Sequence, residues 1–473
     1  MLKGLVPFWV MSAVAGAAPS YTIVTSESSA ADPGWKEVAA ALEAKYPGAT
    51  RVTWSKDVSD CLPELAKQHP RYVCFVSPLS EVSLDFVRHV HRLTRKFDAD
   101  PFTDCRWGIL TGFDAANALR IAKESTPLTI RQTLSGTDIA TERCENARTF
   151  SELEAGKTVS KTAGADATTK TGPADSSFAI ASVLEQPETN LFITSGHATE
   201  RDWQIGYRYK NGVWKSKGGE LFAINLQGEK KPIRSDSAKV YLPVGNCLMG
   251  HIDGPDAMAL AFMNSAGVRQ MTGYTLPTWY GYQGWGMLDY FVEQPGRYTM
   301  NEAFFANQNA LVQRLRTYFP EVAGEDSDSP MGKIAKPIPV GAEAKEAGLT
   351  AQDAQGLLFD RDVVAFYGDP AWQARMAPGP LQWKETWTPD ATGGRLEIKP
   401  LAGAASFKPV NENGSQRGGR PIVRFFEQRI DPASVVITEG ADLKPVITDD
   451  FILVPLPKGD ATDLKIAFTA KSL

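Results

Sequence analysis

The feature that most constrains the fold is an alternation of apolar runs with amphipathic stretches in the first third of the chain. Apolar runs such as 21–26, 71–78 and 107–112 are separated by stretches with helical periodicity, among them 35–46 and 84–97. Strands that alternate with helices are typical of βαβ units, whose strands run parallel. The sequence therefore predicts an α/β domain with a mostly parallel sheet.

The alternation breaks near Thr149. Residues 151–177 are rich in small polar residues without a periodic apolar face, which favours an exposed loop or linker. Regular patterning then resumes, and a long helix is expected after Thr299, where Thr299 and Glu302 have the spacing of a capping box. We therefore predict two βαβ subdomains, at 19–150 and 178–378.

The last part of the chain, 379–473, has a different character. Short apolar runs with strand propensity are separated by turns rich in Gly, Pro, Asn and Asp. This pattern is typical of an all-β module and predicts a C-terminal β-sandwich.

The N-terminus has the pattern of a secretory signal peptide over 1–18. A lysine at position 3 precedes an apolar run from Leu5 to Val14, and small residues follow. We expect cleavage after Ala17 or Ala18 and a secreted or periplasmic mature protein, with no integral membrane segment once the signal is removed. The net charge of −5 and the lack of a basic block argue against nucleic acid as a partner.

The chain has five cysteines: Cys61, Cys74, Cys105, Cys144 and Cys247. In an exported protein an odd number leaves at least one thiol unpaired or intermolecular. The first four could form up to two bridges, in any of three pairings. Cys247 lies about a hundred residues later and has no cysteine near it in the sequence.

His197 and Cys247 both follow apolar runs with strand character, in "NLFITSGHA" and "KVYLPVGNC". Because ligands bind at the carboxyl ends of parallel strands, we expect the two side chains to meet at one edge of the sheet. An imidazole beside a thiol stabilises the thiolate and can later protonate a leaving amine. The pair therefore indicates nucleophilic catalysis by a cysteine.

These two motifs resemble those of the caspase-like cysteine peptidases, and of the gingipain family in particular. The segments 106–125 and 366–376, the latter with Gly-Asp-Pro, resemble the same family, in which an immunoglobulin-like module follows the catalytic region. The resemblance implies that Cys247 is the nucleophile and His197 the general acid/base. It also implies that backbone N–H groups of Cys247 and Ala198 hold the oxyanion, although the family usually has glycine at the second position.

Other residues near these motifs leave alternatives open. Glu200 and Asp202 are near His197 in sequence, but nothing more recommends either as a third catalytic residue. His251, four residues after Cys247, would suit a zinc site only on a helix, and the neighbouring Gly250 and Gly254 favour a loop. We therefore predict no metal site and no required cofactor, and the sequence does not support a structural calcium site.

A run of aromatic residues with glycines between them follows the predicted strand after Cys247. It either lines a substrate pocket or belongs to the core, and the candidate substrate-binding residues are Thr275, Trp279, Tyr280 and Trp285. No acidic residue there marks a preference for arginine or lysine. Further back, His89 and His91 lie in the basic stretch 84–97, which we interpret as a solvated helix face.

Together these patterns predict an exported cysteine endopeptidase that acts on protein or peptide substrates through Cys247 and His197. The alternative is a catalytically inactive relative that binds peptides or a surface.

Overall fold

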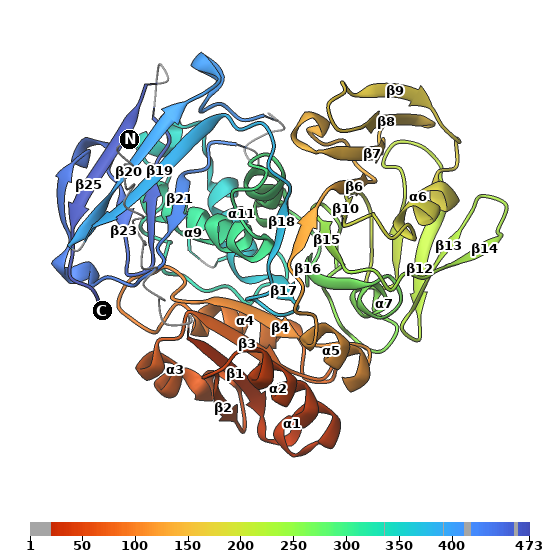
Figure 1. Cartoon of the computed structure of the whole chain (residues 1–473), viewed down its shortest axis with the longest axis horizontal. Helices are drawn as coiled ribbons and strands as arrows, with labels where there is room; N and C mark the ends of the chain where they lie inside the picture. Colours follow the sequence, from red (N-terminus) through yellow and green to blue (C-terminus); the bar gives the residue numbers. More distant parts are fainter. Residues whose placement is uncertain (1–19, 335, 391, 411–417, 458–461) are drawn as a thin grey trace, which may run out of the picture.

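The computed structural model describes residues 20–334, 336–390, 392–410, 418–457 and 462–473, so the predicted signal peptide lies outside the described residues. A twelve-stranded sheet forms the centre of the described chain (Figure 1). In spatial order its strands are β2 (Thr50–Trp54), β1 (Tyr21–Ser26), β3 (Tyr72–Val76), β4 (Arg106–Leu110), β17 (Val364–Tyr367), β16 (Val268–Tyr274), β15 (Lys239–Pro243), β10 (Leu191–Thr194), β6 (Gln132–Ser135), β7 (Asn146–Phe150), β8 (Lys157–Lys161) and β9 (Thr168–Thr171).

This sheet consists of two parallel halves that run in opposite directions. Strands β2, β1, β3, β4 and β17 are parallel to one another, as are β16, β15, β10, β6 and β7. The halves meet where β16 and β17 pair antiparallel. The prediction of a mostly parallel α/β fold is confirmed, but the two predicted subdomains share one continuous sheet.

The Gly-Asp-Pro segment ties the first half of the sheet to the end of the α/β region. Asp369 is buried and accepts hydrogen bonds from the hydroxyls of Tyr21 (2.9 Å) and Tyr46 (2.7 Å). It also forms an ion pair with Lys45 at 2.8 Å. This segment therefore has a structural role that its sequence alone does not reveal.

Helices cover the sheet on both faces, as expected for alternating strands and helices. Those of the first half are α1 (Glu27–Ala31), α2 (Pro33–Lys45), α3 (Leu62–Gln68), α4 (Leu84–Leu93) and α5 (Ala115–Ala122). The later ones are α6 (Ser177–Leu184), α7 (Met258–Ser265), α8 (Tyr282–Met287), α9 (Met300–Tyr318), α10 (Ala342–Glu346) and α11 (Ala351–Asp362), with a π-helical segment at Leu288–Val292. The predicted capping box at Thr299 and Glu302 begins α9.

Two features differ from the sequence-based expectations. The stretch 151–177 is not a structureless loop, because it contains β8 and β9, which extend the sheet as an antiparallel hairpin with β9 exposed. Helix α4 is not a solvated face, because α11 packs on it. His91 is fully buried there, its Nε2 2.8 Å from the carbonyl of Val364, whereas His89 remains partly exposed beside Asp57.

Smaller sheets complete the α/β region. An antiparallel sheet follows β10 and contains β11 (Asp202–Gln204), β12 (Val213–Lys217), β13 (Glu220–Ile224) and β14 (Lys230–Ile233). Strand β18 (Ala374–Met376) pairs with β5 (Leu128–Ile130). None of the described helices is long and apolar enough to span a bilayer.

The C-terminal region consists of two antiparallel sheets with a common apolar core. One contains β19 (Trp383–Asp390), β20 (Gly393–Pro400), β25 (Leu464–Thr469) and β22 (Val436–Glu439), and the other contains β21 (Ile422–Phe425), β24 (Phe451–Val454) and β23 (Val446–Ile447). These sheets lie beside α9 and the first half of the large sheet (Figure 1). The predicted all-β character of this region is confirmed.

Candidate active site

The candidate site is built on two adjacent strands of the second half of the sheet. Strands β10 and β15 are parallel, with Thr194 opposite Pro243. His197 follows the end of β10 by three residues, and Cys247 follows the end of β15 by four. The structure therefore places both residues beyond the carboxyl ends of neighbouring parallel strands, as the sequence predicted.

Asn246 joins the two strand ends. Its buried side chain accepts a hydrogen bond from Thr194 Oγ1 (2.6 Å), and its Nδ2 donates to the carbonyl of Gly196 (3.1 Å). Asn246 immediately precedes Cys247, and Gly196 immediately precedes His197. Each candidate catalytic residue therefore directly follows one of the two residues that the Asn246–Gly196 hydrogen bond joins.

The backbone geometry of these two loops requires glycine at two positions. Gly196 has a φ of 89°, a left-handed conformation that residues with a side chain rarely adopt. At Gly245 the two loops approach each other closely, because a Cβ there would lie 2.4 Å from Ser195 Oγ. A glycine precedes His197 because the chain turns sharply at the end of β10.

The thiol of Cys247 is partly exposed and accepts a hydrogen bond from the backbone N–H of Thr278 at 3.2 Å. The Thr278 hydroxyl donates to the carbonyl of Asn246 (3.0 Å), which fixes the strand-to-helix connection beside the thiol. These contacts fix the position of the sulfur atom, which remains partly exposed.

The other cysteines have a different environment. All five cysteines are free thiols in the structure, so neither of the two bridges that the sequence left open is formed, and Cys61, Cys74, Cys105 and Cys144 are buried. Burial raises the pKa of Cys61 to about 12 and that of Cys144 to about 11. Burial also raises the pKa values of Cys74 and Cys105.

The imidazole of His197 is exposed and packs against the ring of Tyr207, with 5.1 Å between ring centroids. In the described part of the chain, no hydrogen bond joins this ring to the sulfur of Cys247. The backbone carbonyl of His197 accepts from Gln204 N at 2.9 Å. The backbone of the histidine is thus fixed, while its side chain lies at the surface.

The family resemblance draws attention to the backbone amides of Ala198 and Cys247. Neither Ala198 N–H nor Cys247 N–H donates a hydrogen bond to any residue that the structure describes. The next amide differs, because Leu248 has a positive φ of 57° and its N–H donates to the carbonyl of Leu276 (3.3 Å). Both amides that the family resemblance assigns to an oxyanion therefore lack an acceptor among the residues that the structure describes.

Sequence reasoning missed Glu152, which lies just after β7. One carboxylate oxygen accepts from Thr137 Oγ1 at 2.7 Å, and the other is buried and accepts no hydrogen bond of ordinary geometry from the residues that the structure describes. That second oxygen is 3.5 Å from the position a Cβ on Gly196 would occupy. The backbone carbonyl of Glu152 accepts a hydrogen bond from Tyr207 N. Glu152 therefore contacts the turn that precedes His197 and also the residue whose ring packs against His197. Sequence reasoning missed Glu152 because it lies 45 residues before His197.

The four candidate substrate-binding residues divide into two pairs. Thr275 is buried and its hydroxyl donates to the carbonyl of Val363, while Tyr280 is partly buried and packs on Phe359 of α11 at the edge of the core. Trp279 is 53% exposed and follows Thr278 directly. Trp285 lies near Gly245, its ring 3.3 Å from the position of a Cβ there. The two tryptophans flank the loop that carries Cys247.

The other candidates near the site have structural contacts. His251 lies in a turn, and its N–H donates to the carbonyl of Leu248. Glu200 accepts from Met258 N through its backbone, and Asp202 begins β11 opposite Lys215. Neither acidic residue is joined to His197 by a hydrogen bond within the described chain.

Comparison with known proteins gives distant likenesses only. No family model matches the sequence, and no curated protein matches it. Three similar solved structures are an Arg-specific cysteine proteinase, gingipain R (TM-score 0.46, 10% identity, covering 96% of this chain and 97% of that one), the pro- and mature domains of Porphyromonas gingivalis RgpB (0.40, 10%, 96% and 99%), and a protease (0.40, 8%, 97% and 98%). Because all three TM-scores lie below 0.5, the site is assigned on its own geometry.

Proposed function

We propose that the chain is a cysteine endopeptidase of the gingipain and caspase-like type, with Cys247 as nucleophile and His197 as general acid/base. The observation that carries this proposal is the Asn246–Gly196 hydrogen bond between the ends of β15 and β10. This bond supports the proposal because it joins the two adjacent strand ends that are followed by the partly exposed thiol of Cys247 and the imidazole of His197. The signal peptide at 1–18, export and an immunoglobulin-like C-terminal module are parts of the same proposal.

The proposed reaction proceeds through a thioester. His197 takes the proton from Cys247 Sγ, and the sulfur attacks the carbonyl carbon of the scissile peptide bond. The N–H groups of Cys247 and Ala198 donate to the oxygen of the tetrahedral intermediate. The C–N bond then breaks as the imidazolium protonates the leaving amine, and water hydrolyses the acyl-enzyme with His197 as the base.

Glu152 is proposed as a positioning residue in this reaction. Burial raises the pKa of its carboxyl group, while the hydroxyls of Thr137 and Ser195 act in the opposite direction. Glu152 contacts the Gly196 turn and accepts a hydrogen bond from Tyr207 N, so it fixes the backbone on both of these sides of the imidazole. Glu152→Gln should therefore shift the pH dependence of kcat while leaving the fold intact.

The proposal is tested with a peptide that carries an electrophilic acyloxymethyl ketone. We expect this probe to label Cys247, and labelling and peptide hydrolysis to be lost in Cys247→Ala. His197→Ala should slow both by about 10²- to 10⁴-fold, the usual contribution of a general acid/base. The matched control is His251→Ala, which removes another imidazole near the same loop and should leave both rates unchanged. Equal labelling of the wild type and His197→Ala would contradict the proposal.

One observation favours a second candidate function, that of an inactive binding relative. The His197 ring contacts Tyr207, and no hydrogen bond joins it to Cys247 in the described chain. Tyr207→Ala separates the two functions. In a peptidase this change frees the imidazole and keeps or raises the rate of labelling, whereas in an inactive relative Cys247 stays unlabelled and peptide affinity alone changes.

A further inference from the structure

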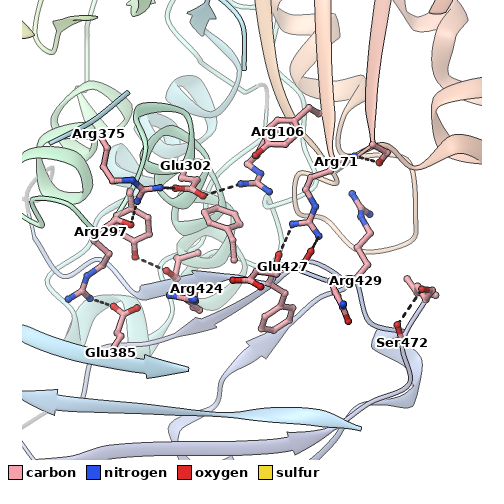
Figure 2. Close-up of a pocket in the computed structure, with 18 residues that line it drawn as sticks. Arg71, Arg106, Arg297, Glu302, Arg375, Glu385, Arg424, Glu427, Arg429 and Ser472 are labelled. Carbon is pink, nitrogen blue, oxygen red and sulfur yellow. Dashed lines mark hydrogen bonds and ion pairs between the residues drawn. The ribbon is translucent and has the colours of Figure 1, made fainter. Parts of the chain in front are cut away.

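A cavity lies between the first half of the sheet and the C-terminal region, and neither Cys247 nor His197 lines it. Its volume is about 1030 Å³, at the upper end of the range for small-molecule sites. The walls include the start of β3, the start of β4 and strand β21 (Figure 2). Residues from distant parts of the chain therefore meet at one solvent-filled space.

The described lining is rich in arginine. Six arginines line the cavity: Arg71, Arg106, Arg297, Arg375, Arg424 and Arg429. Only three glutamates accompany them, at positions 302, 385 and 427. Guanidinium groups bind carboxylate and phosphate oxygens in a planar, two-pronged geometry. The excess of arginines gives the cavity the electrostatic character of an anion site.

The neighbouring acids neutralise only part of this positive charge. Glu385 pairs with Arg297, and Glu302 is shared between Arg106 and Arg375, each at 3.2 Å. Arg71 donates to the backbone carbonyls of Phe426 (2.5 Å) and Glu427 (2.9 Å), which carry no net charge. Arg429 pairs with Asp449, which does not line the cavity.

Among the six arginines, Arg424 has the fewest polar partners for its side chain. Its guanidinium group makes no hydrogen bond or ion pair with any residue that the structure describes, and its Nε is buried without an acceptor among them. Arg106 Nε is likewise buried without an acceptor. The guanidinium of Arg106 is held between the rings of Tyr72 (4.6 Å) and Phe425 (5.2 Å). Stacking of this kind fixes a guanidinium before a ligand arrives.

Like charges in this space also affect one another. Burial and the nearby Arg106 lower the pKa of Arg71. Burial, together with Arg424, lowers the pKa of Arg297 to about 10 despite its partner Glu385. A bound anion would relieve both effects.

We propose that this arginine-lined cavity binds a small multivalent oxyanion, whose phosphate or carboxylate groups bridge Arg71 and Arg106 of the α/β region and Arg424 of β21. Figure 2 shows the first two reaching from the α/β strands toward the strand that carries the third. Ligation from both sides would hold the C-terminal sheets against the large sheet. The proposal is independent of Cys247 and goes beyond the proposed peptidase function.

The test uses the full chain with pyrophosphate and with citrate, each against sodium chloride of equal ionic strength. We expect a saturable rise in melting temperature and a calorimetric Kd below about 1 mM for at least one of the two. A response to pyrophosphate alone assigns the site to phosphate groups, and a response to citrate alone assigns it to carboxylates.

Two variants locate the binding. Arg424→Gln should weaken binding at least tenfold, whereas the control Arg395→Gln, which changes an exposed arginine of β20 paired with Glu439, should leave it unchanged. Equal loss in both variants would overturn the proposal. Titration of the unmodified chain does not depend on how a variant folds, and a Kd above about 1 mM for both anions would also overturn it.

Discussion

At the scale of single residues, accessibility separates the cysteines. The sulfur of Cys247 lies at the surface, while the other four thiols belong to the apolar core. Buried thiols resist deprotonation, and the thiolate is the form that reacts. The protein thus keeps one thiol available without using disulfides to protect the rest.

Brief treatment of the native chain with iodoacetamide at pH 7 should therefore alkylate Cys247 and leave Cys61, Cys74, Cys105 and Cys144 unmodified. In denaturant all five should react, because the pKa values that burial raises return to their ordinary range. Mass spectrometry of the digested protein locates the labels. Modification of Cys144 at a rate similar to that of Cys247 in native buffer would contradict the buried environment described above.

A second prediction concerns Asp104, whose Oδ2 accepts from Phe97 N at 2.7 Å. Burial, reinforced by Asp98, raises its pKa to about 9, against about 3.9 in an unfolded chain. The folded state thus binds the proton more tightly, and this contribution to stability is lost as the pH rises from about 4 to about 9.

Asp104→Asn removes this titration and keeps an oxygen for Phe97 N. Relative to the wild type, the variant should become steadily more stable as the pH rises from 5 to 9. Urea unfolding at pH 5, 7 and 9 measures the difference. A difference that does not change with pH would show that Asp104 titrates normally.

At the scale of elements, the site depends on how closely two loops approach each other beyond β10 and β15. Gly245→Ala would push a methyl group toward Ser195 Oγ, and overpacking of this kind costs about 1–3 kcal/mol. We expect the rate of peptide hydrolysis to fall at least tenfold in this variant, because displacement of the loop moves Cys247. Activity assays measure the loss of hydrolysis, and thermal unfolding measures the loss of stability.

The matched control for this change is Gly254→Ala, in the same connection. A Cβ there would meet nothing within 4 Å. This variant should keep both stability and activity, and a similar loss in both variants would mean that the connection tolerates no side chain at all.

The strands and most helices of the α/β region could be predicted from the sequence because local periodicity determines them. The same local patterns placed His197 and Cys247 at strand ends. Long-range contacts could not be predicted in this way. His91 is buried by distant segments, because Trp107 of β4 and Phe304 of α9 pack on its ring and α11 packs on α4. Glu152 likewise reaches the Gly196 turn through the pairing of β6, β7 and β10.

At the scale of the whole molecule, the C-terminal sheets are tightly joined to the α/β region. The carbonyls of Pro421 and Val423 accept from the hydroxyls of Tyr290 and Tyr298, each at 2.6 Å. Arg420 and Asp289 form a buried ion pair at 2.8 Å. Contacts of this kind make the two regions unfold together.

Arg420→Ala should therefore destabilise the entire chain. Breaking a buried ion pair costs about 3–5 kcal/mol, whereas removing the exposed pair of Arg395 and Glu439 costs about 1 kcal/mol or less. Calorimetry should show one transition that moves to lower temperature in Arg420→Ala and stays almost unchanged in Arg395→Ala. Two separate transitions in the wild type would mean that the regions unfold independently.

The position of β17 in the sheet has a consequence for synthesis. This strand is formed by residues 364–367, yet it lies between β4 and β16, which precede it by about 250 and 90 residues. The two halves cannot join until β17 has left the ribosome, and contacts between such distant residues form slowly. A nascent chain already contains the segments with His197 and Cys247, but their supporting sheet is incomplete. The peptidase activity proposed above would thus arise only after nearly the whole α/β region has been made, and until then it would not act on other proteins inside the producing cell.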